Sequence, residues 1–191
     1  ARLQALKAAS ISAAPTVPPP GPSPADAADP MASDGTQALE RGRRLETMRQ
    51  YADAVAVYRE GLQQSPEQDE IRAALARLFS WQGAHADAAT LYREVLTRHP
   101  QDQDIRVALA QVLSWQKQFE EAHRLYQEVL QADPAQFEAR RGLADIAHWQ
   151  GNRSEALQRY ETLFAETHDP EVEDQLKAIK SELHAASLPH A

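Results

Sequence analysis

Residues 75–100 read LARLFSWQGAHADAATLYREVLTRHP, and residues 109–134 read LAQVLSWQKQFEEAHRLYQEVLQADP. When the two stretches are aligned, they match at leucine, alanine, tryptophan, tyrosine and proline positions. A third copy carries the phrase IAHWQG, so that the only tryptophans of the chain, Trp81, Trp115 and Trp149, are evenly spaced. Agreement at so many positions with one period indicates an internal structural repeat.

The repeat has a period of about 34 residues and covers most of the chain. Tyrosine and alanine recur in four units, and proline recurs in three of them. These positions are Tyr58, Tyr92, Tyr126 and Tyr160; Ala54, Ala88, Ala122 and Ala156; and Pro66, Pro100 and Pro134. The pattern therefore predicts four repeats, at about residues 35–68, 69–102, 103–136 and 137–170.

Each unit contains two segments with apolar residues at helical spacing. In the second unit, Leu75 and Phe79 lie on one face of the first segment, and Ala88 and Tyr92 lie on one face of the second. Gly83 predicts the turn between the two helices, and proline ends the second helix because the residue before proline disfavours the α conformation. One hairpin cannot bury its apolar faces alone. We therefore expect an all-α protein in which the hairpins stack as a right-handed α-solenoid.

The N-terminal residues 1–34 differ in composition from the repeats. Seven of the twelve prolines fall within residues 15–30, and this stretch holds almost no large apolar side chain. Proline fixes φ and removes backbone hydrogen-bond donors. Residues 1–34 are therefore predicted to form an extended or disordered arm.

A capping helix is predicted over residues 170–184, after the last repeat. Asp169 suits the N-cap position, and Pro170 suits the first helical turn. One apolar stripe follows, formed by Val172, Leu176, Ile179 and Leu183. Residues 185–191 are expected to form a tail.

The repeat resembles the tetratricopeptide repeat. Its small residue on the first helix is matched by Gly42, Ala76, Ala110 and Ala144, and its other characteristic positions by the alanines, tyrosines and prolines given above. The resemblance covers about residues 35–168, and with the capping helix it implies a tetratricopeptide repeat domain over residues 35–184. It also implies a non-enzymatic scaffold that binds a protein partner.

The phrase LARLFSWQG followed by LYREVL is similar to repeats in the periplasmic regions of bacterial outer-membrane proteins that export exopolysaccharides. Magnetosome-associated repeat proteins are a further comparison. This resemblance implies a location in the bacterial cell envelope, either in the periplasm or on a membrane-associated complex. The residues themselves are also compatible with the cytoplasm.

Composition disfavours several other classes of function. A net charge of -8 argues against binding to nucleic acid or to an anionic membrane surface. No apolar run is long enough to span a bilayer, and the absence of cysteine excludes disulfides and thiolate metal sites. The sequence contains no glycine-rich loop of the kind that binds phosphate. It also contains no nucleophile motif and no paired histidine motif. We therefore expect no enzyme activity, no cofactor and no metal.

The tryptophans lie on the first helix of their repeats, on the side turned away from their own hairpin. Trp81 follows Ala76 by five positions, which places it about 140° round the helix. The predicted partner-binding concave face consists of Arg43, Arg77, Trp81, Gln111, Trp115, Asp145 and Trp149. The polar side chains of this face change from basic at Arg43 to acidic at Asp145. This charge gradient would orient a partner, or the face would simply be solvated.

Two interpretations of the tryptophans remain open. In one, each indole packs on the next repeat; in the other, the three form a ladder that stacks on a peptide or on sugar rings. Burial of most of an indole of roughly 200 Å² contributes up to about 5 kcal/mol, which favours packing.

Three functions follow as hypotheses. The first is an interaction scaffold for exopolysaccharide export or assembly. The second is an accessory subunit that stabilises another membrane protein complex through the arm and the concave groove. The third is carbohydrate binding on the tryptophans, with a polysaccharide as the ligand.

Overall fold

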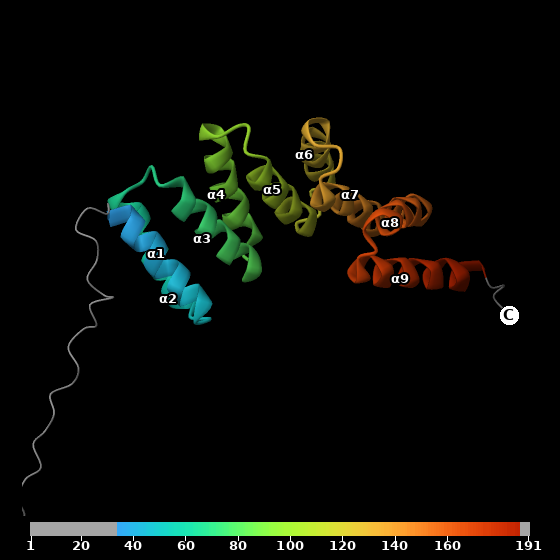
Figure 1. Ribbon diagram of the computed structural model, residues 1–191, viewed down its shortest axis with the longest axis horizontal. Helices are drawn as coiled ribbons and strands as arrows, with labels where there is room; N and C mark the ends of the chain where they lie inside the picture. The colour runs from blue at the N-terminus through green and yellow to red at the C-terminus, as the bar shows by residue number, and fades with distance from the viewer. Residues whose placement is uncertain (1–33, 188–191) are drawn as a thin grey trace, which may run out of the picture. The chain divides into compact units, whose positions relative to one another are not determined.

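The computed structural model describes residues 34–187, and every regular element in this range is an α-helix (Figure 1). The helices are α1 (Asp34–Thr47), α2 (Tyr51–Gln64), α3 (Asp69–Trp81), α4 (His85–Arg98), α5 (Gln103–Trp115), α6 (Phe119–Ala132), α7 (Phe137–Trp149), α8 (Arg153–Thr167) and α9 (Pro170–Ser187). The predicted all-α class is confirmed. The predicted arm lies outside the described residues except for Asp34.

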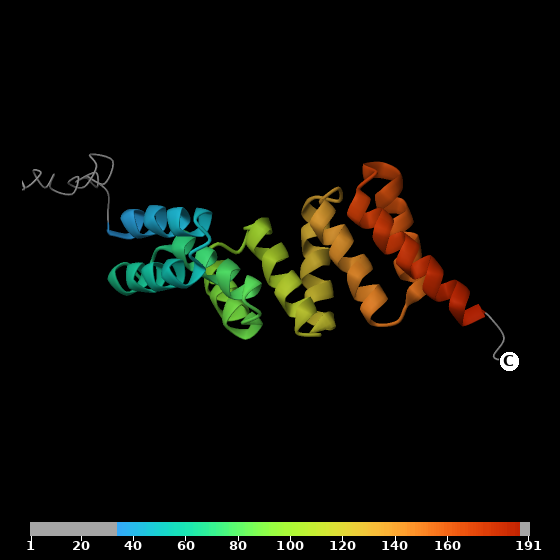
Figure 2. The same ribbon diagram turned by 90° about the horizontal axis from the view of Figure 1, so that it is seen from below.

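Consecutive helices pair as hairpins: α1 with α2, α3 with α4, α5 with α6, and α7 with α8. Each hairpin also contacts the next through its second helix (Figure 2). The first helices contact one another directly, α1 with α3, α3 with α5, and α5 with α7. The predicted solenoid of stacked hairpins is therefore confirmed.

A left-handed residue follows the first helix of every hairpin. Gly83 (φ 79°) and Gly151 (φ 83°) take this conformation, which glycine adopts without strain. Arg49 and Lys117 take it in the other two hairpins, with φ of 59° and 60°. After Gly83, the N–H of Ala84 donates to the carbonyl of Phe79 at 2.8 Å, as in a Schellman-type cap. All four turns thus share one geometry although only two contain glycine.

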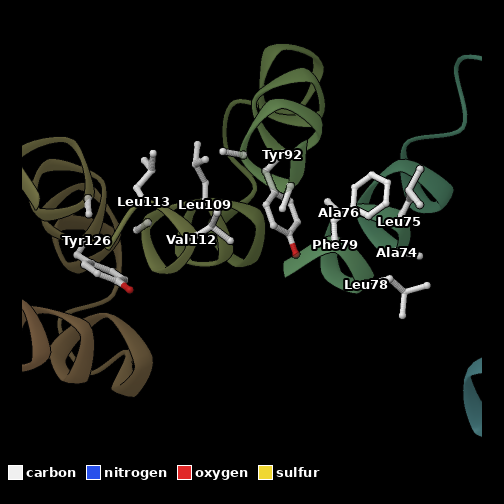
Figure 3. Close-up of a cluster of buried hydrophobic side chains, with 14 of the residues drawn as sticks. Ala74, Leu75, Ala76, Leu78, Phe79, Tyr92, Leu109, Val112, Leu113 and Tyr126 are labelled. Atoms are coloured by element: carbon white, nitrogen blue, oxygen red, sulfur yellow. The ribbon is translucent and has the colours of Figure 1, made fainter. Parts of the chain in front are cut away.

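The recurring tyrosines fill the core of the hairpins. Tyr58 and Tyr160 are fully buried, and Tyr92 and Tyr126 nearly so (Figure 3). The small residues of the first helices make room for these rings. A Cβ added at Gly42 would lie 2.1 Å from Cε1 of Tyr58. The small residue and the tyrosine of the repeat are therefore in direct contact in the first hairpin.

The buried side chains form two clusters that meet at α7. The larger cluster runs from Leu39 on α1 to Ile146 on α7. The smaller cluster contains Ala144 and Ala147 from α7, together with side chains of α8 and α9. Helix α7 therefore contributes one face to each cluster.

Arginines join the second and third hairpins to the loops that precede them. Arg72 donates to the carbonyl of Pro66 and lies 2.8 Å from Glu94. Arg106, the equivalent residue of the next repeat, donates to the carbonyl of Pro100 and lies 3.3 Å from Glu128. Each arginine therefore ties a first helix both to its own second helix and to the proline that follows the preceding hairpin.

Helix α9 covers the end of the fourth hairpin. Asp169 Oδ1 accepts hydrogen bonds from the N–H groups of Glu171 at 2.8 Å and Val172 at 3.2 Å, which confirms the predicted N-cap. The apolar stripe is buried at Val172, Leu176 and Ile179. The helix continues to Ser187, beyond the predicted end at residue 184, because the alanines that follow favour helix.

Replacement of Gly142 with alanine should destabilise the protein by about 1–3 kcal/mol. A Cβ at this position would lie 2.2 Å from Cζ of the buried Tyr126 ring, so that the third and fourth hairpins would have to move apart. Urea unfolding followed by circular dichroism measures the loss. Gly151→Ala adds backbone strain without a clash, because its φ is positive and no atom outside its chain neighbours lies within 4 Å of the added Cβ, so it separates the effect of strain from that of the clash. An unchanged unfolding midpoint for Gly142→Ala would contradict the contact.

Candidate partner-binding surface

The three tryptophans are the last residues of α3, α5 and α7. Trp81 is 61% exposed, Trp115 is 39% exposed and Trp149 is 48% exposed. Packing therefore hides more than half of Trp115 and of Trp149, but less than half of Trp81.

Each indole contacts one aromatic ring of the preceding hairpin. The ring pairs are Tyr51 with Trp81 (6.4 Å between centroids), His85 with Trp115 (5.1 Å), and Phe119 with Trp149 (6.3 Å). These partners are the first residues of α2, α4 and α6 and occupy the same position in successive repeats. The packing interpretation therefore holds in part, and these ring contacts are made with the preceding repeat.

A groove of about 790 Å³ brings the three tryptophans together. We call it the aromatic groove. It is lined by Ser80, Trp81, Gly83, His85, Ser114, Trp115, Lys117, Phe119 and Trp149. These residues come from the ends of the first helices, the turns after them and the starts of α4 and α6. A row of half-exposed aromatic side chains in one groove is typical of a binding surface.

A smaller cavity of about 110 Å³ lies between α5 and α7, and we call it the polar pocket. It is lined by Val107, Gln111, Ser114, Trp115, Tyr126, Glu138, Arg141, Gly142, Asp145 and Trp149. Three of these residues, Ser114, Trp115 and Trp149, also line the aromatic groove. The two cavities are therefore adjacent, and four of the seven predicted site residues line the polar pocket.

The two predicted arginines line neither cavity. Arg77 is 2.6 Å from Glu46, and its guanidinium carbon lies 5.1 Å from the ring centroid of Trp81. Arg43 is an exposed residue of α1. Of the predicted site residues, Gln111, Asp145 and the tryptophans therefore line the two cavities. Arg77 lies beside Trp81, and Arg43 lines neither cavity.

Asp145 borders the polar pocket and is the acidic residue of the predicted face. It is half-buried and accepts a hydrogen bond from the hydroxyl of Tyr160. Burial raises the pKa of the Asp145 carboxyl above its usual value, against the opposing effects of that hydrogen bond and of the charges of Arg141 and His148.

These two basic residues are engaged elsewhere. Arg141 is 3.1 Å from Glu171 and 3.8 Å from Glu138, and His148 is 3.3 Å from Glu182. Within residues 34–187, no lysine, arginine or histidine forms a direct ion pair with Asp145. The carboxyl of Asp145 therefore borders the polar pocket without a cation in contact.

Sequence reasoning missed several residues of the groove. His85 and Phe119 line the groove and follow the repeat spacing, but their residue types differ, so a search for identical residues passes over them. Ser80 and Ser114 also follow this spacing and precede tryptophan directly. Their position before Trp81 and Trp115 is the signal that could have found them.

Comparison with known families decides the classification of the chain. Models described as tetratricopeptide repeat match residues 39–103, 82–125 and 116–179. The chain belongs to the tetratricopeptide repeat family. Tetratricopeptide repeat proteins generally mediate protein–protein interactions, so the chain is a scaffold of this kind. Among curated proteins, none matches it.

Solved structures similar to this chain include proteins from several bacteria, among them a tetratricopeptide repeat protein. One from Parabacteroides merdae is 17% identical with a TM-score of 0.73, and the match covers 85% of this chain and 64% of that protein. MamA from Desulfovibrio magneticus is 15% identical with a TM-score of 0.70, covering 81% and 88%. PilF from Pseudomonas aeruginosa is 18% identical with a TM-score of 0.65, covering 80% and 70%. The chain thus spans less than two thirds of the Parabacteroides protein.

At these identities the likeness shows the tetratricopeptide repeat fold alone. None of these matches concerns exopolysaccharide-export proteins in particular. The resemblance to those proteins is therefore still a prediction. Of the helices described, none is long and apolar enough to cross a membrane. Over residues 34–187, histidine, aspartate and glutamate side chains form no cluster suited to a metal ion.

Proposed function

We propose that the chain is a non-enzymatic scaffold of the bacterial cell envelope that holds a protein partner in the aromatic groove. The exposed tryptophans carry this proposal. Three indoles that are 39–61% exposed lie in one groove, where a partner would remove them from water. Tryptophan is enriched among the residues that dominate binding energy at protein interfaces.

The cell-envelope location follows from the predicted resemblance of the repeats to periplasmic regions of exopolysaccharide-export proteins. The partner would then be a component of an export apparatus or of another membrane-associated complex. Cell fractionation of the full-length protein in its native host tests this part. Recovery in the cytoplasmic fraction alone would contradict it.

A photo-cross-linking residue at position 117 tests the groove as the binding site. Lys117 lines the aromatic groove and is exposed, so a partner in the groove would lie within reach. We expect one cross-linked protein from cells, identified by mass spectrometry. The matched control is position 127, because Gln127 is exposed on α6 and lines neither cavity. Equal cross-linking at both positions would count against the groove.

Trp149→Leu should weaken binding of the identified partner by about 30-fold or more, as is typical of a tryptophan hot spot. Calorimetric titration of the purified pair measures the change. Met48→Ala is the matched control, since Met48 is 60% exposed and lies outside the groove. A similar affinity for both variants would show that the tryptophan does not hold the partner.

Carbohydrate binding is the second candidate, because exposed indoles also stack on sugar rings. Titration with oligosaccharides, followed by indole fluorescence, distinguishes the two functions. Saturable quenching without a protein cross-link at position 117 would favour carbohydrate. A cross-link without quenching would favour the protein partner.

A further inference from the structure

The chain itself shows what can occupy the face of one of its tryptophans. Arg77 is four residues before Trp81 on α3, and residues at this spacing are neighbours on a helix surface. The guanidinium carbon of Arg77 lies 5.1 Å from the centroid of the Trp81 ring, within the range of a cation–π interaction. In the second hairpin, a guanidinium therefore covers the indole from within the chain.

The third and fourth hairpins lack this internal cation. Gln111 stands four residues before Trp115, and Asp145 stands four residues before Trp149. Across the described residues, no arginine or lysine lies over either of these indoles. An amide and a carboxylate thus replace the arginine, and both groups accept hydrogen bonds from a guanidinium.

The polar pocket brings these acceptors together beside the two indoles that no arginine or lysine covers. Gln111, Asp145 and Glu138 line it together with Trp115 and Trp149. The basic residue of its lining, Arg141, is engaged with Glu171 and Glu138.

Asp145 is the acceptor that most needs a cation. It accepts a hydrogen bond from the Tyr160 hydroxyl and has no direct ion-pair partner among residues 34–187. A half-buried carboxylate without a cation in contact favours a ligand that supplies one.

We propose that the polar pocket binds the guanidinium group of an arginine side chain of the protein partner. The guanidinium stacks on Trp149 and donates to Asp145 and Gln111, in the arrangement that Arg77 takes over Trp81. This inference rests on the proposed function, because the arginine belongs to the protein that occupies the aromatic groove. The shared residues Ser114, Trp115 and Trp149 make the pocket a side branch of that groove.

Size and charge support arginine as the occupant. The pocket volume of about 110 Å³ corresponds to about four water molecules at roughly 30 Å³ each, which suits one side chain and not a chain segment. The net charge of -8 attracts a basic partner. Arginine can stack its planar face on an indole while its edge donates hydrogen bonds, whereas the ammonium group of lysine cannot stack in this way.

N-acetylarginine amide is a suitable probe, followed by the indole Nε1–H signals of the purified full-length chain in nuclear magnetic resonance spectra. We expect saturable shifts of the Trp149 signal, and no comparable shift of the Trp81 signal, because Arg77 already covers that ring. N-acetylcitrulline amide, which is neutral and nearly the same shape, should bind at least tenfold more weakly. Equal shifts with both amides, or equal shifts of Trp81 and Trp149, would overturn the proposal.

Two substitutions sharpen the test. Asp145→Asn keeps an oxygen to accept the Tyr160 hydroxyl bond but removes the charge, and should weaken binding of N-acetylarginine amide at least tenfold. Asp87→Asn is its control, since Asp87 is exposed on α4 and lines neither cavity. Gln111→Arg should place an internal guanidinium over Trp115, as Arg77 does over Trp81, and compete with the probe. Unchanged binding in both Asp145→Asn and Gln111→Arg would contradict the assignment.

The two proposals can fail separately. A cross-link at position 117 without any specific effect of N-acetylarginine amide would leave the protein scaffold standing and remove the arginine pocket. Specific binding of N-acetylarginine amide without a cross-linked protein would show a guanidinium site in the polar pocket but would remove the protein partner from the aromatic groove.

Discussion

Between pH 10 and pH 12 the protein should lose most of its stability, because its buried tyrosines resist ionisation in the folded state. Burial raises the pKa of Tyr92 to about 12 from its ordinary value of 10.0. Burial is also the main cause of the raised pKa of Tyr58, Tyr126 and Tyr160. All four tyrosines therefore make the folded state less stable relative to the unfolded state as the pH rises.

The direction of the change in stability with pH depends on which state, folded or unfolded, releases its tyrosine protons first. Above pH 10 the unfolded chain ionises its tyrosines while the folded chain keeps them protonated, so rising pH favours unfolding. The stabilising contribution is complete below pH 10 and is lost as the pH passes through the folded-state pKa. For Tyr92 alone, which is 4% exposed, the loss is roughly 2–3 kcal/mol.

Circular dichroism and tyrosinate absorbance, recorded together between pH 8 and pH 13, measure this transition. Tyr92→Phe keeps the ring and removes the ionisable hydroxyl, so it should lose less stability than the parent over the same range. Tyr51→Phe is the matched control, because Tyr51 is 40% exposed. Complete tyrosine ionisation near pH 10 with unchanged helix content would contradict the prediction.

Tyr126→Ala should lower the free energy of unfolding by about 3–5 kcal/mol, the range for removal of a large buried ring. Tyr126 is 2% exposed and lies in the same buried cluster as Leu109 and Leu113 (Figure 3). Its ring also meets Gly142 on α7, so that it supports both its own hairpin and the seam to the next. The substitution therefore opens a cavity at two interfaces.

Urea unfolding at pH 7.5 measures this loss. Tyr51→Ala carries the same change at an exposed ring and should cost much less. Tyr126→Phe keeps the ring and removes only the hydroxyl, so this variant should retain most of the stability. A similar loss for Tyr51→Ala and Tyr126→Ala would show that burial at the seam is not the cause.

The fold could be predicted from the sequence because each helix boundary has a local cause that repeats. Pro66, Pro100 and Pro134 each follow the last residue of a second helix by two positions, and Gly83 and Gly151 follow first helices. Helix α9 is described as far as Ser187. The apolar stripe alone ends earlier, at Leu183, which is why it gave a shorter helix.

The candidate site could be predicted only in part. The spacing of the tryptophans placed them together, but their exposure depends on how far the neighbouring hairpin extends beyond each helix end. The lack of a direct ion pair at Asp145 depends on the register between α5 and α7 and on the engagement of Arg141 by Glu171. Periodicity within one chain carries no information about these contacts between helices.

Because α7 contributes to both buried clusters, the two ends of the solenoid need not open together. Helices α8 and α9 depend on the smaller cluster, whereas the groove tryptophans lie on helices that also belong to the larger one. A protease that attacks a transiently detached C-terminal end would shorten the chain from that side first. The groove tryptophans would be retained longest, since Trp149 belongs to the helix at which such trimming would stop.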